Sequence, residues 1–297
     1  MLENAFNLFL SKNLLIDPGF GLAQLVEYEH KLSLVESGMS LKEVFGSKDS
    51  VKIEILENSN SNVVNINPLQ VKETINSLQS GSIVSIDLVG FMSVEDGLCS
   101  YGALTYSSII EQLALSQKVI GLRIFSNTGG GESMAGQIWY EAIKGFRETQ
   151  KPVIGHVLIA GSAGYKAMCG CNEIVAMNEM SYYGSIGTMA SFSKQNLDFI
   201  RENMIYYYSR NSDEKNKSIR ELLKGNSEVI IDELDEVSSI FQNIVKENRP
   251  LKGDVENTLK GDMFIYEKAK ERGLVDSIGN TNYVVSRIMS YKYNNFN

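Results

Sequence analysis

Residues 119–131 read VIGLRIFSNTGGG, an apolar run that ends in three consecutive glycines. A second stretch of the same kind, residues 152–165, reads PVIGHVLIAGSAGY and places Ser162 among small residues. Each apolar run is typical of a buried strand, and each is followed by a helical pattern. The two stretches therefore predict strands that pass into helices through glycine-marked turns.

Strands and helices alternate around these two stretches. We expect strands at 83–89, 119–125, 152–159 and 173–176, with helices at 105–118 and 132–150. Such alternation predicts an α/β domain in which crossover helices pack on a sheet. Beyond it, the pattern predicts a helix at 192–203, a strand at 204–208, a polar loop at 209–218 and a long helix at 227–248.

We expect three regions along the chain. These are an N-terminal helical and strand region (1–80), a main domain (81–290) and a frayed tail (291–297). Within the first region the pattern predicts a helix around 22–32, a strand at 51–55, a loop at 58–62 and a helix at 68–78. Pro68 suits the start of that last helix, where its missing N–H costs nothing.

Composition narrows the class of protein. The chain has 297 residues, 43% hydrophobic and 22% charged, with a net charge of −8, as in an ordinary soluble globular protein. An acidic chain without a basic block disfavours nucleic-acid binding. The apolar runs are too short for a membrane span, and the N-terminus lacks the basic start and long apolar centre of a secretion signal. We therefore expect a cytoplasmic protein that is not secreted and has no membrane span.

The cysteines and histidines argue against a metal site. Three cysteines, Cys99, Cys169 and Cys171, make a poor disulfide framework, which favours a reducing compartment. The latter two are interpreted as small core thiols rather than half of a metal site. With only His30 and His156 available, a histidine-rich metal site is not expected, and no cofactor is predicted.

Ser162 is a candidate nucleophile at the start of a helix. Its small neighbours let a substrate chain come close, and the helix dipole favours developing negative charge. The plain alternative is a helix-capping serine, worth roughly 1 kcal/mol. Gly129, Gly130 and Gly131 could turn a backbone N–H toward an acyl oxyanion, or simply form a turn. Glu132 follows them, and an acidic residue there opposes a phosphate site.

The residues alone leave the base undecided. His156 lies within a strand-like run and is interpreted as a core histidine, which disfavours a Ser-His-Asp triad. A lysine can act as base only where burial keeps it neutral near the working pH. Lys166 is a candidate by proximity to Ser162, although a solvated lysine on a helix face is the ordinary explanation. Lys215 and Lys217 lie in a polar loop, and nothing local singles them out.

Together, four segments resemble the signal peptide peptidase A family of Ser/Lys serine peptidases. They are RIFSNTGGG (123–131), the strand into AGSAGY (160–165), GSIG (184–187) and GLVDSIG (273–279). The resemblance covers roughly residues 81–289. It implies an α/β fold like that of the Clp protease and the crotonases, with a mainly parallel sheet. Thr128 stands where the family has a proline, and Ala163 where it has a glycine.

The resemblance also implies site residues. It makes Ser162 the nucleophile and Lys215 the base, with Lys217 as the near alternative, because residues 210–216 fall where the family has its lysine loop. Ser185 is implied as the hydroxyl that holds the lysine amine. The N–H groups of Gly130 and Ala163 are implied as the oxyanion hole.

The subfamily implied is the soluble protease C type, which matures phage heads by cleaving scaffold and capsid proteins. The sequence LIDP at residues 15–18 resembles the start of such proteases. We therefore expect a protein or peptide substrate and a homo-oligomer, in the host cytoplasm or the phage prohead. The alternatives are protein degradation by a host signal-peptide-peptidase-like enzyme, a crotonase-type acyl-CoA enzyme, or a non-catalytic structural relative.

Overall fold

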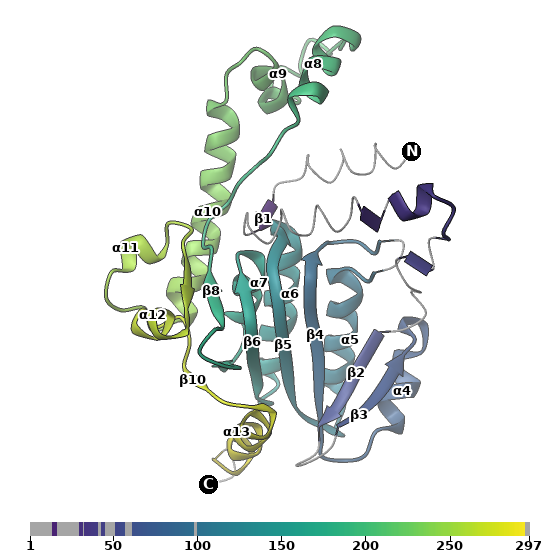
Figure 1. The fold of residues 1–297 in the computed structure, drawn as a ribbon, viewed down its shortest axis with the longest axis vertical. Helices are drawn as coiled ribbons and strands as arrows, with labels where there is room; N and C mark the ends of the chain where they lie inside the picture. Colours follow the sequence, from purple (N-terminus) through teal and green to yellow (C-terminus); the bar gives the residue numbers. More distant parts are fainter. Residues whose placement is uncertain are drawn as a thin grey trace.

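The structure is a computed structural model that describes residues 14–16, 30–31, 33–40, 43–44, 51–56, 61–97 and 100–294 (Figure 1). Its strands are β1 (Leu14–Ile16), β2 (Val51–Leu56), β3 (Ser61–Ile66), β4 (Ser82–Met92), β5 (Val119–Glu132), β6 (Val153–Gly161), β7 (Glu173–Ala176), β8 (Tyr182–Gly184), β9 (Met263–Ile265) and β10 (Ser277–Ile278). Its helices are α4 (Val71–Ser77), α5 (Ala103–Leu115), α6 (Ser133–Glu148), α7 (Ala163–Met168), α8 (Lys194–Asn203), α9 (Lys217–Leu223), α10 (Glu228–Asn248), α11 (Val255–Thr258), α12 (Tyr266–Glu271) and α13 (Thr281–Asn294).

The described strands form one sheet with the order β10-β7-β6-β5-β4-β2-β3 along its main path. From β4 to β10 every neighbouring pair on this path is parallel. Parallel neighbours require crossover connections, and α5 and α6 supply them on one face of the sheet. The predicted α/β class, with crossover helices packed on a mainly parallel sheet, is confirmed.

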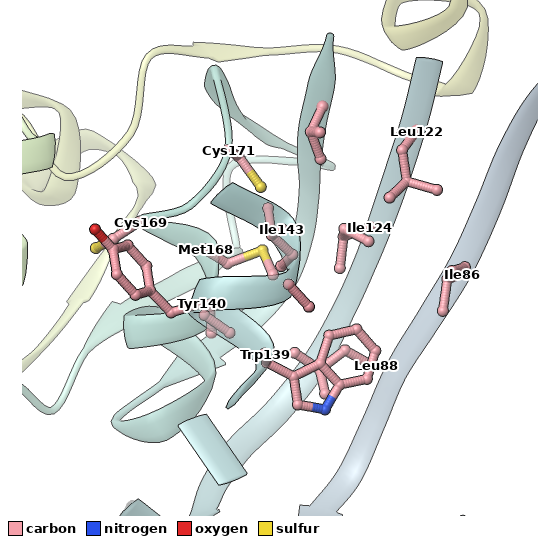
Figure 2. Close-up of a cluster of buried hydrophobic side chains, with 14 of the residues drawn as sticks. Ile86, Leu88, Leu122, Ile124, Trp139, Tyr140, Ile143, Met168, Cys169 and Cys171 are labelled. Carbon is pink, nitrogen blue, oxygen red and sulfur yellow. The ribbon is translucent and has the colours of Figure 1, made fainter. Parts of the chain in front are cut away.

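The main core lies between the sheet and the helices α5, α6 and α7. Figure 2 shows inward side chains of β4 and β5, such as Ile86 and Ile124, facing Trp139 and Ile143 of α6. All four are buried. Of the apolar residues at helical spacing in α6, Trp139, Ala142 and Phe146 are buried core residues, whereas Met134 is exposed.

The opposite face of the sheet has a smaller core. Ile83, Ile154 and Val175 point to this face and pack against Val284 and Ile288 of α13. Alternate residues of a strand point to opposite faces of the sheet, so these continuous apolar runs contribute side chains to both cores. Helix α13 continues to Asn294 and thus includes part of the expected tail, while residues 295–297 lie outside the described residues.

The region before residue 81 adds strands to the same sheet. Strand β2 pairs antiparallel with β4 on one side and with β3 on the other. A short 3-10 turn at Pro68–Gln70 leads into α4, close to the predicted helix at 68–78. Of the predicted helix at 22–32, only residues 30–31 are described, and they are helical. Of the predicted loop at 58–62, only Ser61 and Asn62 are described, and they belong to β3.

Helices α8 and α9 project from the sheet on an arm (Figure 1). Neither helix has a buried residue. The predicted strand at 204–208 is wrong, because these residues have no regular structure and the Tyr207 side chain is 91% exposed. Aromatic residues favour strands because they pack against a neighbouring strand, and among the described residues no strand pairs with this run.

Candidate active site

Ser162 occupies a strained turn between β6 and α7. Its φ is +52° and its ψ is −118°, a combination that L-residues rarely adopt. Holding a non-glycine residue there costs about 1–3 kcal/mol, which the surroundings must offset. The Ser162 N–H donates to the carbonyl of Gly184 at 2.8 Å, and the residue is 1% exposed. This arrangement is similar to a nucleophile elbow, a sharp and strained turn between a strand and a helix that carries a nucleophilic side chain.

The small neighbours of Ser162 let the serine turn pack closely against β5. A Cβ at Gly161 would lie 3.1 Å from the carbonyl oxygen of Gly129, and one at Gly164 would lie 2.5 Å from Cγ2 of Thr128. Glycine is thus needed so that the end of β5 can pack against the serine turn. The structure brings the two glycine-marked segments together, as the sequence expected.

Strand β5 continues through the three glycines to Glu132 instead of ending at Phe125. Gly130 has a φ of +109°, and its N–H donates to Oγ1 of Thr128 at 3.0 Å. This hydrogen bond gives Thr128, which stands in the family's proline position, a role of its own. The Ala163 N–H belongs to the first residue of α7, where an α-helix provides no internal acceptor.

Ser185 lies beside Ser162. Strand β8 runs parallel to β6 with Gly184 opposite Gly161, so each serine directly follows a paired residue. Ser185 is also buried and also has a φ of +52°, and its N–H donates to the carbonyl of Asp262 at 2.8 Å. The structure therefore places two strained serines side by side at one end of the sheet.

The single chain does not bring Lys215 to Ser162. Lys215 is exposed, in a turn where its N–H donates to the carbonyl of Ser212, two residues before α9 at the tip of the arm. Lys217 is exposed as well, and its amine bonds to the Glu214 carboxylate at 2.8 Å. Among the described residues, no hydrogen bond joins either lysine to Ser162.

Lys166 is buried, so the interpretation as a solvated lysine on a helix face is wrong. It is 2% exposed because α7 packs between the sheet and α6, and its N–H donates to the carbonyl of Ser162 at 3.0 Å. Burial lowers the pKa of Lys166 to about 8, against the opposing attraction of Glu141. A buried amine one turn beyond the nucleophile is a feature that the sequence pattern did not reveal.

His156 is a core histidine with both ring nitrogens paired. Nε of Arg123 donates to Nδ1 at 3.0 Å, so Nε2 carries the proton and donates to the carbonyl of Gly279 at 2.9 Å. Burial and the Arg123 charge lower the pKa of His156 to about 4. The ring is therefore neutral at pH 7 and engaged, as the sequence predicted, and it takes no part in a triad.

The two described cysteines are core residues. Cys169 and Cys171 are free and buried, and burial raises the pKa of Cys169 to about 12. Within the described residues, no three metal-ligating side chains gather where they could hold an ion. Nor does any helix in that part of the chain have the length and apolar character to cross a membrane.

The described residues also form a pocket whose lining does not include Ser162. It has a volume of about 450 Å³ between β4 and α5, and its lining includes Asp87, Phe91, Met92, Tyr106 and Trp139. Burial, followed by the charge of Glu54, raises the pKa of Asp87. The pocket adjoins the glycines of β5, because Phe91 and Met92 pair with Gly130 and Gly131.

The site thus consists of a strained serine between a strand and a helix, at one end of a mainly parallel α/β sheet. The model of peptidase family S49 matches residues 145–294, half of the chain, and the chain belongs to that family. Membership makes it a serine peptidase by class, of the signal peptide peptidase A kind that the sequence resembles. The matched residues include Ser162, Ser185 and Lys215, but not the glycines of β5.

Solved structures show distant likenesses over most of the chain. An enoyl-CoA hydratase from Shewanella pealeana ATCC 700345 is 11% identical, with a TM-score of 0.44 over 75% of this chain and 77% of that one. An enoyl-CoA hydratase from Mycobacterium smegmatis is 12% identical, with a TM-score of 0.41 over 70% and 72%. A mutant of the membrane-bound stomatin-specific protease 1510-N is 13% identical, with a TM-score of 0.37 over 70% and 85%.

Proposed function

We propose that the protein is a Ser/Lys endopeptidase in which Ser162 is the nucleophile. The observation that carries this proposal is the strained Ser162 turn, which packs against Gly129 of β5 and lies beside Ser185. Strain at a buried serine is retained where the surrounding structure enforces it, and such residues gather at active sites.

The proposed reaction follows acyl-transfer chemistry. The Ser162 hydroxyl attacks the scissile carbonyl carbon while the neutral amine of Lys215 takes the hydroxyl proton. The N–H groups of Gly130 and Ala163 hold the oxyanion, after Gly130 exchanges its bond to Thr128 for one to substrate. The C–N bond then breaks, and the lysine gives its proton to the leaving amine. Water, activated by the same lysine, hydrolyses the acyl-enzyme.

In this proposal Lys215 reaches Ser162 of a neighbouring copy. The arm that carries Lys215 has helices without a buried residue and exposes Phe199, Met204, Ile205 and Tyr207. Large apolar groups gathered in this way mark a surface that another protein covers. Docking of the arm on a second copy would bury these groups and give the lysine the dry surroundings that favour its neutral form.

We propose scaffold and capsid proteins of a phage prohead as the substrates. The support is the resemblance of residues 15–18 to the start of protease C enzymes. Degradation of host proteins by a cellular enzyme is the alternative within the same chemistry. Mass spectrometry of a prohead scaffold protein incubated with the enzyme separates the two, because only the first predicts discrete cleavage sites there.

The test of the chemistry is a pair of substitutions with a covalent probe. Ser162→Ala and Lys215→Ala are each expected to abolish cleavage of an unfolded protein substrate, while Lys217→Ala, as the matched control, retains it. A serine-directed acylating probe is expected to label Ser162. Turnover close to that of the parent in either variant rejects the assignment. Binding of an acyl-CoA with Ser162 unlabelled would instead favour a crotonase-type enzyme.

A further inference from the structure

Strand β1 lies along β5 at the glycines. It runs antiparallel to β5, with Leu14 opposite Glu132, Leu15 opposite Gly131 and Ile16 opposite Gly130. These three residues come from a part of the sequence more than a hundred positions away. They pair with the segment that packs against the Ser162 turn.

The register decides which edge of β5 carries β1. Strand β4 already occupies one edge there, since Phe91 pairs with Gly130 and Met92 with Gly131. Strand β1 must therefore take the other edge, which β6 occupies as far as the pair Thr128 and Ala160. Strand β1 thus continues the line of β6, beyond the point where β6 turns away into Ser162.

The direction of β1 points its carboxyl end at the nucleophile. Ile16 stands opposite Gly130 and Ala160 stands opposite Thr128, so the two are separated by two residues of β5. At the rise of a strand this is roughly 7 Å along the sheet. Ser162, two residues after Ala160, lies at this junction, and β1 runs toward it from Leu14 to Ile16.

We propose that the edge of β5 at Gly130–Glu132 is the substrate-binding edge, and that the chain's own segment Leu14–Ile16 occupies it as a competitor of substrate. A peptide bound by strand addition gains its affinity from main-chain hydrogen bonds, and side chains set its selectivity. The occupant is three consecutive apolar residues. The edge therefore takes extended peptides with branched apolar residues on the amino side of the reacting bond.

The assignment of this edge to substrate rests on the proposed peptidase function, whereas its occupation by β1 does not. Both are tested in full-length protein that carries Ser162→Ala, so that no turnover interferes. One variant adds Leu14→Pro, Leu15→Pro and Ile16→Pro, which removes every N–H that β1 offers β5. The matched control adds Leu14→Ala, Leu15→Ala and Ile16→Ala, which keeps those donors.

The first measurement is hydrogen exchange of the backbone amides at Gly131 and Glu132. Successive N–H groups of a strand point to opposite edges, so one of these two amides faces β1 and the other faces β4. At the amide that faces β1 we expect exchange at least about tenfold faster in the proline variant than in the parent, with the alanine variant closer to the parent. Equal exchange in the proline variant and the parent would show that β1 does not protect this edge. That result would overturn the inference, whether or not Ser162 is the nucleophile.

The second measurement uses a fluorescent peptide with the sequence of residues 10–18, LSKNLLIDP. A tethered competitor has a high effective concentration, so the peptide is expected to bind the proline variant at least about tenfold more tightly than the parent. Equal affinity for both would overturn the inference. Tighter binding combined with an unlabelled Ser162 in the active chain would leave the edge in place and reject only the peptidase chemistry.

Discussion

Nη2 of Arg249 lies 2.7 Å from Oδ1 of Asp276. The other oxygen of Asp276 accepts from the N–H of Ile174 at 2.7 Å, and Nε of Arg249 donates to the carbonyl of Gly273 at 3.3 Å. The closing motif GLVD (273–276) therefore ties the end of α10 to strand β7. Its residues hold the fold together and do not face Ser162.

Removing the carboxylate of this pair should be costly. The Arg249 side chain is 4% exposed, so Asp276→Asn leaves a buried guanidinium without its counter-charge. We expect a loss of about 3 kcal/mol in the free energy of unfolding. Urea denaturation measures it. Glu148→Gln is the control, because it breaks an exposed pair with Lys144 and should cost no more than about 0.5 kcal/mol.

The strain at Ser162 should be visible in stability. Its positive φ suits glycine, so Ser162→Gly is expected to be more stable than Ser162→Ala by roughly 1 kcal/mol. Thermal unfolding compares the two, both of which are inactive in the proposed mechanism. Ser108 lies inside α5, where the order should reverse, with glycine less stable than alanine. The same order at both positions would argue against a strained nucleophile turn.

Lys166→Met should stabilise the protein at pH 7. Burial disfavours the charged amine, and methionine fills similar space without charge. The folded-state pKa of about 8 lies below the reference value of 10.5, so the unfolded chain binds more protons between these values. The stability of the parent therefore rises with pH across this window, and the advantage of the variant shrinks.

Urea midpoints at pH 7 and pH 10 check this prediction. Lys246→Met, on an exposed position of α10, is the matched control and should change neither midpoint much. An advantage of Lys166→Met that stays constant between pH 7 and pH 10 would indicate that folding does not lower the pKa of this amine, because the folded and unfolded chains would then bind equal numbers of protons.

His156 should make the protein sensitive to acid. Its pKa falls from 6.5 to about 4 in the fold, so the unfolded chain binds the proton first and stability is lost as pH falls through this range. Full protonation would cost on the order of 3 kcal/mol by the linkage relation. Protonation at Nδ1 also breaks the bond from Arg123. His156→Gln should flatten the difference between unfolding at pH 7 and at pH 4.5, and an unchanged difference would assign the acid sensitivity to other groups.

Activity should return when two inactive variants are mixed. If Lys215 acts on Ser162 of a neighbouring copy, mixed oligomers of Ser162→Ala and Lys215→Ala contain intact pairs, and about a quarter of the parent activity is expected. The subunits are unfolded and refolded together, and cleavage of a protein substrate is followed. A chain carrying both substitutions, mixed with either variant, is the control. Recovery no greater than in this control contradicts a site shared between copies.

Part of the fold could be predicted from local pattern alone. The apolar runs that became β4, β5, β6 and β7 are buried on both faces, so their hydrophobicity marks them whatever surrounds them. The long amphipathic helix at 227–248 was predicted within one residue of α10. The run at 204–208 failed for the opposite reason, because strand formation depends on a neighbour that this run lacks.

The candidate site was predicted in part. Ser162, Ser185 and the glycines of β5 were identified from motifs, and the structure places them together. The burial of Lys166 was missed, because the position alone does not say that α6 covers it. The roles of Ser162, Ser185, Lys215, Gly130 and Ala163 in the reaction stay predictions.

The sequence by itself determined the α/β class, the order of strands and helices from β4 to β7, and which small residues mark the serine turn, because periodicity and the special backbone needs of glycine are local properties. Only the tertiary structure decided that Leu14–Ile16 lies along β5 next to Ser162, that Lys166 is buried, and that Lys215 lies on the arm and not beside Ser162. Those three facts depend on which distant segments share a surface. Contacts of that kind are set by packing and register across the whole sheet, and no window of sequence contains them.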